Sequence, residues 1–148
     1  TRFEGSNKIN VVPPEAWAEL DCRILPDRPA EVFIEEIGQL VAGAGIDIEV
    51  IMAFTAAISP TDTVLYAAIE EVTGERHPGS RVTPYVSTGF TDSHFFRDIG
   101  IPSYGFDPTI VAEAEFSRIH GNDERIRVDA FKRGVIDHLA IIAAVVYD

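Results

Sequence analysis

The chain has 148 residues, of which 46% are hydrophobic and 24% are charged, proportions typical of a soluble globular domain. This length is enough for one ordinary core or for two small ones. Acidic residues outnumber basic residues by 24 to 12, so the formal net charge is -12. Because nucleic acid and anionic membrane surfaces would be repelled, we expect neither as a partner.

Cysteine usage bears on the compartment. The chain has one cysteine, Cys22, which excludes an intrachain disulfide and is compatible with a reducing compartment, so we expect a cytoplasmic location. The longest apolar run, residues 139–146, is too short to span a bilayer. The sequence lacks an initial Met and starts within a strand-forming stretch. We therefore expect it to be a piece of a longer protein.

The first part of the chain predicts the order β-β-α-β. Residues 8–12 predict a short strand, and strict alternation over residues 16–25 predicts a second strand with one polar face. Apolar residues at helical spacing predict a helix over residues 30–42, which two glycines then end. Residues 46–54 alternate again and predict a third strand.

The second part predicts alternating strands and helices, with a boundary near residues 54–59. A segment rich in capping residues starts a helix that runs through Val72. The later predicted elements are a strand over 82–86, a short helix over 92–99, a strand over 101–106 and a long amphipathic helix with apolar residues Val128, Phe131, Val135, Leu139, Ile142 and Val146. This alternation predicts parallel pairing, with ligand sites at the carboxyl ends of strands.

The four histidines differ in their surroundings. His77 precedes Pro-Gly and is expected to be an exposed turn residue, whereas His138 is expected on the polar surface of the last helix. His94, in the first turn of a short helix, is expected to be packed and hydrogen-bonded. His120 lies in a polar loop before Gly121, which would let the backbone approach a ligand closely. We therefore take His120 as the functional candidate.

Two polar residues of the first part could bind a carboxylate. Arg23 lies on the polar face of its predicted strand, and Asn10 lies on the preceding strand, close by if the two strands pair. An arginine fork and an amide together suit a carboxylate. The alternative is a surface ion pair of Arg23 with Glu19 or Asp21, which contributes little to stability.

A second polar loop, residues 87–93, opens a predicted helix. Its backbone N–H groups and hydroxyls could hold an anion, or Asp92 or Thr91 could simply cap the helix. A Ser-His-Asp triad is conceivable, but no Gly-x-Ser-x-Gly motif supports it. The sequence also lacks a P-loop, Gly-x-Gly-x-x-Gly and His-Glu-x-x-His.

Taken together, several segments resemble the aminoacylase/carboxypeptidase family of two-zinc metallopeptidases, which includes acetylornithine deacetylase, succinyl-diaminopimelate desuccinylase and carboxypeptidase-S-like enzymes. The matching segments are residues 10–13 with 20–26, 59–63, 88–97, and 101–106 with 119–124. Their order and spacing agree over nearly the whole chain. The resemblance implies an α/β fold: a partial ferredoxin-like lid (β-β-α-β) over residues 1–55, and the C-terminal βα part of the catalytic domain over residues 56–148.

The resemblance also implies roles for single residues. His120 matches a ligand of one of two zinc ions, and imidazole is a natural zinc donor. Asn10 and Arg23 match a lid pair that holds the substrate's carboxylate or carbonyl. Gly89 and Thr91 match the loop at the edge of the site, where Phe90 stands in place of a frequent glycine. The implied substrates are N-acyl amino acids or small peptides, and the implied assembly is a homodimer formed through the lid.

The family's other zinc ligands and its glutamate general base lie earlier in the sequence than the matched segments. We therefore expect the intact protein to be a zinc-dependent amidohydrolase, and this chain alone to contain no catalytic residue and to be inactive. Two alternatives remain. One is a dimerisation or binding module without catalysis, since an open sheet edge can pair. The other is a small metal site built from Asp92, His94 and His120.

Overall fold

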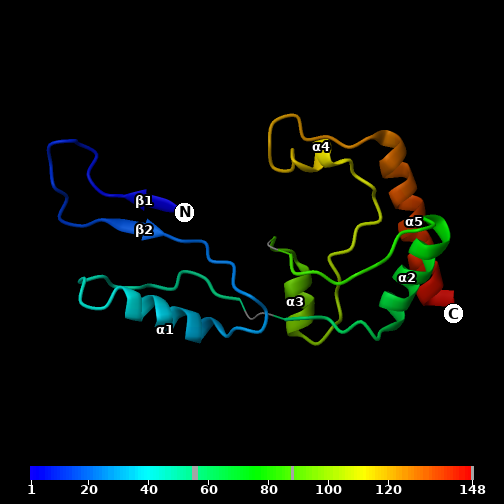
Figure 1. The fold of residues 1–148 in the computed structure, drawn as a ribbon, viewed down its shortest axis with the longest axis horizontal. Coiled ribbons are helices and arrows are strands. Elements are labelled where there is room, and N and C mark those ends of the chain that lie inside the picture. The colour runs from blue at the N-terminus through cyan, green and yellow to red at the C-terminus, as the bar shows by residue number, and fades with distance from the viewer. Residues whose placement is uncertain (55–56, 88, 148) are drawn as a thin grey trace. The chain divides into compact units, whose positions relative to one another are not determined.

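The computed structural model describes residues 1–54, 57–87 and 89–147, and its contacts divide the chain into two compact units, Thr1–Ala56 and Ala57–Asp148. Figure 1 shows the elements along the chain, five helices and one small sheet in the described part. This mixture of helix and strand is compatible with an α/β protein. The units are described separately below. No helix in the described residues is long and apolar enough to cross a membrane.

The first unit contains a two-stranded antiparallel sheet. Strand β1 (Arg2–Glu4) pairs with β2 (Trp17–Glu19), with Phe3 opposite Ala18. Arg2 Nη1 lies 3.3 Å from Glu19 Oε2, and the same guanidinium lies 5.3 Å from the centre of the Trp17 ring. Cross-strand pairs of this kind favour the observed register.

Helix α1 (Ala30–Leu40) follows in the first unit and confirms the predicted helix. Gly43 and Gly45, with φ of 79° and 67°, lie just beyond it in the left-handed region, which glycine adopts without a steric penalty. The helix buries none of its residues, and none of residues 1–54 is buried. The first unit therefore has secondary structure but no fully buried core.

The core lies in the second unit and centres on helix α2 (Val64–Arg76). Thr63 caps this helix, since its Oγ1 accepts a hydrogen bond from the Tyr66 N–H at 3.1 Å. The core cluster consists of Ala68, Ile69 and Val72 of α2 and Ile141 of helix α5 (Val128–Tyr147). Figure 1 shows α2 and α5 side by side. The helix predicted after the capping segment is thus confirmed, and it continues past Val72 to Arg76.

Helix α5 packs through a different face from the one its apolar pattern favours. The buried residues are Ala130, Gly134, Asp137 and Ile141, at spacings of four and three. The apolar residues singled out in the sequence are exposed, for example Phe131 at 54% and Leu139 at 60%. The small residues Ala130 and Gly134 let neighbouring segments approach α5 closely. The packed face of α5 therefore carries less apolar surface than its exposed face.

Most predicted strands do not form. Residues 8–12, 46–54, 82–86 and 101–106 are all described, and none of them is a strand. The predicted β-β-α-β order is thus present only in part. A helix satisfies its backbone groups within itself, whereas a strand needs a neighbouring ladder. Val82, Tyr104 and Phe106 still pack against the core cluster, so these segments keep an inward-facing apolar side chain without a strand partner.

Candidate functional site

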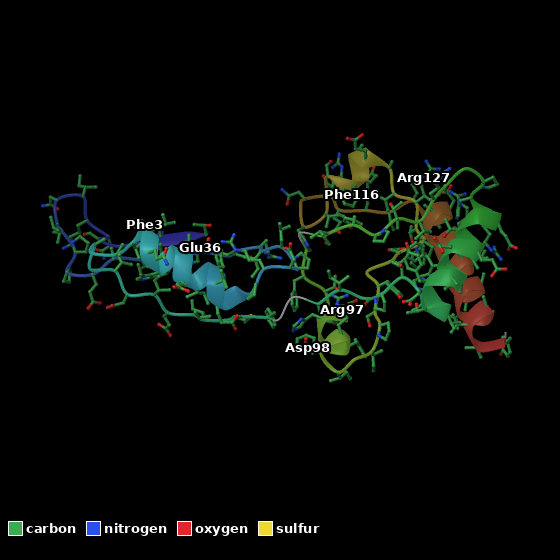
Figure 2. The ribbon with its side chains drawn as sticks, turned by 60° about the horizontal axis from the view of Figure 1, so that its bottom comes forward. Phe3, Glu36, Arg97, Asp98, Phe116 and Arg127 are labelled. Atoms are coloured by element: carbon green, nitrogen blue, oxygen red, sulfur yellow. The ribbon has the colours of Figure 1, made fainter. Side chains whose placement is uncertain are left out.

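His120 lies in the loop between two helices of the second unit. Helix α4 (Glu113–Phe116) precedes it and α5 follows it, and Figure 2 labels Phe116 and Arg127 at the two ends of this loop. His120 is exposed and adopts φ of 62°, a left-handed conformation that costs about 1–3 kcal/mol in a non-glycine residue. Such a conformation persists only where the surroundings determine it, and it often marks a functional turn.

Two hydrogen bonds fix the backbone around His120. The Gly121 N–H donates to the Arg118 carbonyl at 2.8 Å, and the His120 N–H donates to Glu124 Oε2 at 3.2 Å. A Cβ atom at Gly121 would lie 3.1 Å from the same Arg118 oxygen, which is too close for an unstrained contact. The glycine after the histidine therefore allows the tight turn that presents His120 to solvent.

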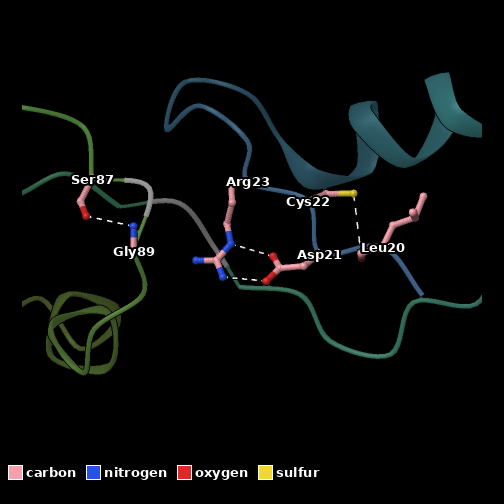
Figure 3. Close-up of polar contacts among 6 residues, drawn as sticks. All are labelled: Leu20, Asp21, Cys22, Arg23, Ser87 and Gly89. Carbon is pink, nitrogen blue, oxygen red and sulfur yellow. Dashed lines mark hydrogen bonds and ion pairs between the residues drawn. The ribbon is translucent and has the colours of Figure 1, made fainter. Parts of the chain in front are cut away.

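Arg23 lies in the first unit, beyond β2, and forms a two-point ion pair with Asp21. Its Nε and Nη2 atoms donate to the two Asp21 carboxylate oxygens at 2.6 and 2.7 Å, as Figure 3 shows. This hydrogen bonding, with the attraction of opposite charges, lowers the pKa of Asp21 and raises the pKa of Arg23. The fork is exposed and geometrically suited to a carboxylate, and here it binds an internal one.

Asn10 does not lie on a strand beside Arg23. It occupies a turn within the segment that joins β1 to β2, and its residue is exposed. The sheet is instead formed by residues 2–4 with residues 17–19, and the Arg2–Glu19 ion pair lies across this ladder. The expected strand pairing that would bring Asn10 close to Arg23 is therefore wrong for this structure.

The loop containing Gly89 and Thr91 leads into the short helix α3 (Ser93–Asp98). The Gly89 N–H donates to Ser87 Oγ at 3.0 Å, also drawn in Figure 3, and the Thr91 carbonyl accepts from the His94 N–H at 3.2 Å. Asp92 occupies the N-cap position without a side-chain capping bond. Thr88 lies outside the described residues. Within this loop, the Gly89 N–H thus contacts a serine hydroxyl, and the Thr91 carbonyl contacts the first turn of α3.

His94 is a packed residue, as expected. Its side chain is 10% exposed, its Nε2 lies 3.1 Å from Asp98 Oδ2, and its ring centre lies 5.1 Å from that of Phe95. No group of three or more His, Cys, Asp or Glu side chains within the described ranges could hold a metal ion. The proposed small metal site of Asp92, His94 and His120 is therefore not formed.

A zinc site of the implied kind requires several convergent ligands, usually three from the protein in a catalytic site. His120 fits one ligand position, because its imidazole is exposed on a fixed turn and imidazole nitrogen is a common zinc donor. In the described part of the chain, His120 belongs to no group of three or more side chains that could hold a metal ion. These residues can thus supply one zinc ligand but do not form a complete site.

His77 and Asp137 form a polar contact that the sequence did not reveal. His77 Nε2 lies 2.8 Å from Asp137 Oδ2, and Arg76 Nη1 lies 3.4 Å from Asp137 Oδ1. Asp137 is buried on α5, and His77 is half-buried, so the expectation of a simply exposed His77 is wrong. The two residues line a pocket of about 160 Å³. No spacing rule links positions sixty residues apart in sequence, and only the packing of α2 on α5 unites them.

Known proteins resemble the chain over most of its length. It is 32% identical to human N-fatty-acyl-amino acid synthase/hydrolase PM20D1 over 139 residues, which cover 91% of this chain and 28% of that protein. It is 30% identical to mouse aminoacylase-1 over 149 residues, covering 97% of this chain and 35% of that protein. It is 24% identical to the probable carboxypeptidase S-like 2 of Dictyostelium discoideum over 135 residues, covering 90% and 26%.

The chain therefore spans between about a quarter and about a third of the length of the curated relatives that it matches. No solved structure gives a significant match. The profile of one peptidase family matches residues 4–144, nearly the whole chain and both of its compact units. The order of the matched segments and the similarity to an aminoacylase and a carboxypeptidase-like protein agree with that profile. The chain belongs to peptidase family M20/M25/M40.

Proposed function

We propose that this chain is the C-terminal portion of a zinc-dependent amidohydrolase that cleaves the amide bond of N-acyl amino acids or small peptides. The observation that carries the proposal is the family match over residues 4–144. The names of two relatives, an N-fatty-acyl-amino acid synthase/hydrolase and an aminoacylase, support N-acyl amino acids as the substrate class. The first unit would be part of the lid and dimerisation domain, and the second unit the end of the catalytic domain.

In this proposal His120 is one zinc ligand, and Arg23 with Asn10 binds the substrate's carboxylate or carbonyl. The exposed fork of Arg23 supports its role, because a substrate carboxylate can replace Asp21 on the same two donors. Asn10 would have to leave its present turn and join the fork. Gly89 and Thr91 would line the edge of the site. None of these side chains is a general base, so the base would come from another part of the protein.

The 148-residue chain alone should be inactive. One histidine cannot hold a catalytic zinc ion that needs three protein ligands. Purified chain, incubated with zinc and an N-acyl amino acid, should release no free amino acid above the rate without protein. Release that depends on His120 would contradict this part of the proposal.

A chimaera tests the proposed roles directly. The matching segment of human PM20D1 would be replaced by this chain, and hydrolysis of an N-fatty-acyl amino acid would be measured. We expect an active chimaera whose activity is abolished by His120→Ala. His138→Ala is the matched control, because His138 is exposed on α5 outside the loop. Equal activity of the two variants would remove His120 from the site.

The second candidate function is a dimerisation or binding module. The observation favouring it is the two-stranded sheet of the first unit, whose outer edges have no further strand among the described residues. Such edges recruit other strands. A homodimer is also expected under the first proposal, so mass measured by size-exclusion chromatography at several concentrations tests self-association for both. A strict monomer would count against it.

The proposed location is the cytoplasm. Its support is compositional and structural: the single cysteine, Cys22, is free and exposed, which suits a reducing compartment. Fractionation of the native source with an antibody against the chain would test this. Recovery from a secreted fraction would contradict it.

A further inference from the structure

The loop that presents His120 is closed at its base by an ion pair. Arg125 Nε lies 3.0 Å from Glu115 Oε2, and Arg125 Nη2 lies 3.3 Å from Glu115 Oε1. The Glu115 side chain is only 20% exposed, and Arg118 Nε approaches it at 3.9 Å. The two partners are ten positions apart, one on α4 and one beyond the turn, and His120 lies midway between them.

Among the described ion pairs, this pair spans a segment with two non-glycine residues of positive φ. Within the closed segment, His120 and Asp123 both adopt positive φ, 62° and 59°. The Arg118 carbonyl and the Glu124 carboxylate accept the N–H groups of Gly121 and His120. Two left-handed non-glycine residues so close together need surroundings that hold them. A two-point guanidinium–carboxylate contact supplies a fixed distance and orientation between the ends of the segment.

We infer that Glu115 and Arg125 are positioning residues that hold His120 in its left-handed conformation and so direct its imidazole towards a metal ion. The inference rests on the proposed role of His120 as a zinc ligand. Neither residue touches the metal. They act on the ligand through the backbone, as outer partners that orient metal-binding histidines do.

Arg125→Lys tests the role of the fork. Lysine keeps the charge but is a point donor that cannot make the planar two-point contact. Arg127→Lys is the matched control, because Arg127 makes the same kind of fork to Asp129, at 3.0 and 3.2 Å, without enclosing a loop. The readout is nuclear magnetic resonance of the isotope-labelled chain, in which a strong N–H to Hα cross-peak within one residue reports positive φ.

We expect the His120 signature of positive φ to be lost in Arg125→Lys and kept in Arg127→Lys. The exchanged pair, Glu115→Arg with Arg125→Glu, should restore it, because the contact is re-formed with its ends reversed. Unchanged amide signals from α2 and α5 show in each case that the second unit remains folded. Retention of the positive-φ signature at His120 in Arg125→Lys would overturn the inference.

A zinc titration separates this inference from the proposed function. The titration uses the chimaera with human PM20D1, which under the proposed function would supply the remaining ligands. His120→Ala should weaken zinc binding there, and Arg125→Lys should weaken it about 10-fold. Zinc affinity unchanged by His120→Ala would end the ligand role, while the backbone result still decides whether the pair positions His120. A loss in His120→Ala with none in Arg125→Lys would end the positioning role and leave the ligand role standing.

Discussion

The two compact units differ in how many helix residues they bury. Helix α1 of the first unit buries no residue, and none of residues 1–54 is buried. Helix α2 of the second unit buries four residues, because α5 covers it. The first unit relies on exposed ion pairs such as Arg2–Glu19 and Arg23–Asp21, and pairs of this kind contribute little. The comparison teaches that an amphipathic helix is stabilised mainly by the surface that covers it.

The largest expected effect comes from cutting a side chain in the covered helix. Ile69 is 4% exposed and belongs to the core cluster, so Ile69→Ala should lower the free energy of unfolding of the second unit by about 2–5 kcal/mol. Ile37 of α1 is the matched position in the other unit and is only half-buried. Ile37→Ala should cost clearly less. Urea denaturation followed by circular dichroism measures both.

Hydrogen exchange sharpens the same test. In the unaltered chain the amides of α2 and α5 should exchange more slowly than those of α1, since protection follows burial. Ile69→Ala should remove this difference. Similar losses of stability for Ile69→Ala and Ile37→Ala would mean that apolar burial stabilises the first unit as much as the second.

The second prediction concerns ion pairs, one in each unit. Asp137 is buried and bonds to His77 and Arg76, so Asp137→Asn should destabilise the second unit by about 1–3 kcal/mol. The Asp21–Arg23 pair is shorter but exposed, and Asp21→Asn should cost clearly less. Denaturation midpoints of the two variants make the comparison. A larger loss for Asp21→Asn would show that distance matters more than burial here.

The third prediction compares two glycines on the packed helices. A Cβ atom at Gly134 of α5 would overlap the Thr109 hydroxyl and lie 3.1 Å from Thr109 Cβ. Gly134→Ala should therefore cost about 1–3 kcal/mol through overpacking. Gly74 of α2 has nothing within 4 Å of such an atom, so Gly74→Ala should stabilise by about 0.4–1 kcal/mol. Opposite shifts in melting temperature are expected. Shifts of the same sign would refute the close contact between residue 109 and α5.

Sequence patterns predicted the helices well and the strands poorly, for a physical reason. The helix over residues 64–76 starts after Thr63 as its capping signal indicates, since cap and helix are local features. The alternation over residues 46–54 and 82–86 says which side chains share a face but not which neighbour completes the ladder. On α5, periodicity marked the face with the most apolar residues. Packing instead uses the face with Ala130 and Gly134, where close approach is possible.

In the candidate site, too, local features could be predicted from the sequence and non-local features could not. The position of His120 before Gly121 in a polar loop was readable, because a tight turn has a local residue pattern, and the structure places His120 in such a turn. The fork that closes this loop joins positions 115 and 125, and no pattern in either segment pairs them. The placement of Asn10 near Arg23 depended on strand pairing, a non-local feature, and the strand predicted over residues 8–12 does not form.

The smallest expected effect is electrostatic. Asp129 of α5 is exposed, and hydrogen bonding from Arg127, aided by Arg133, lowers its pKa from 3.8 to about 2. A carboxyl with a depressed pKa in the folded state contributes stability above its unfolded pKa, and this contribution is lost as the pH falls from 3.8 through about 2. Nuclear magnetic resonance titration of the side-chain carboxyl should show the low pKa directly, and Arg127→Lys should raise it.

Asp21 in the first unit is the matched carboxyl, since its pKa is lowered in the same direction by Arg23. Both titrations should move towards the ordinary aspartate value at high salt, because exposed charges are screened. If the two carboxyls behave alike while Ile69→Ala and Ile37→Ala differ, surface electrostatics is common to the units and apolar burial is what separates them. A salt-resistant titration at Asp129 alone would instead mean that charge pairing, too, is stronger in the unit with the core.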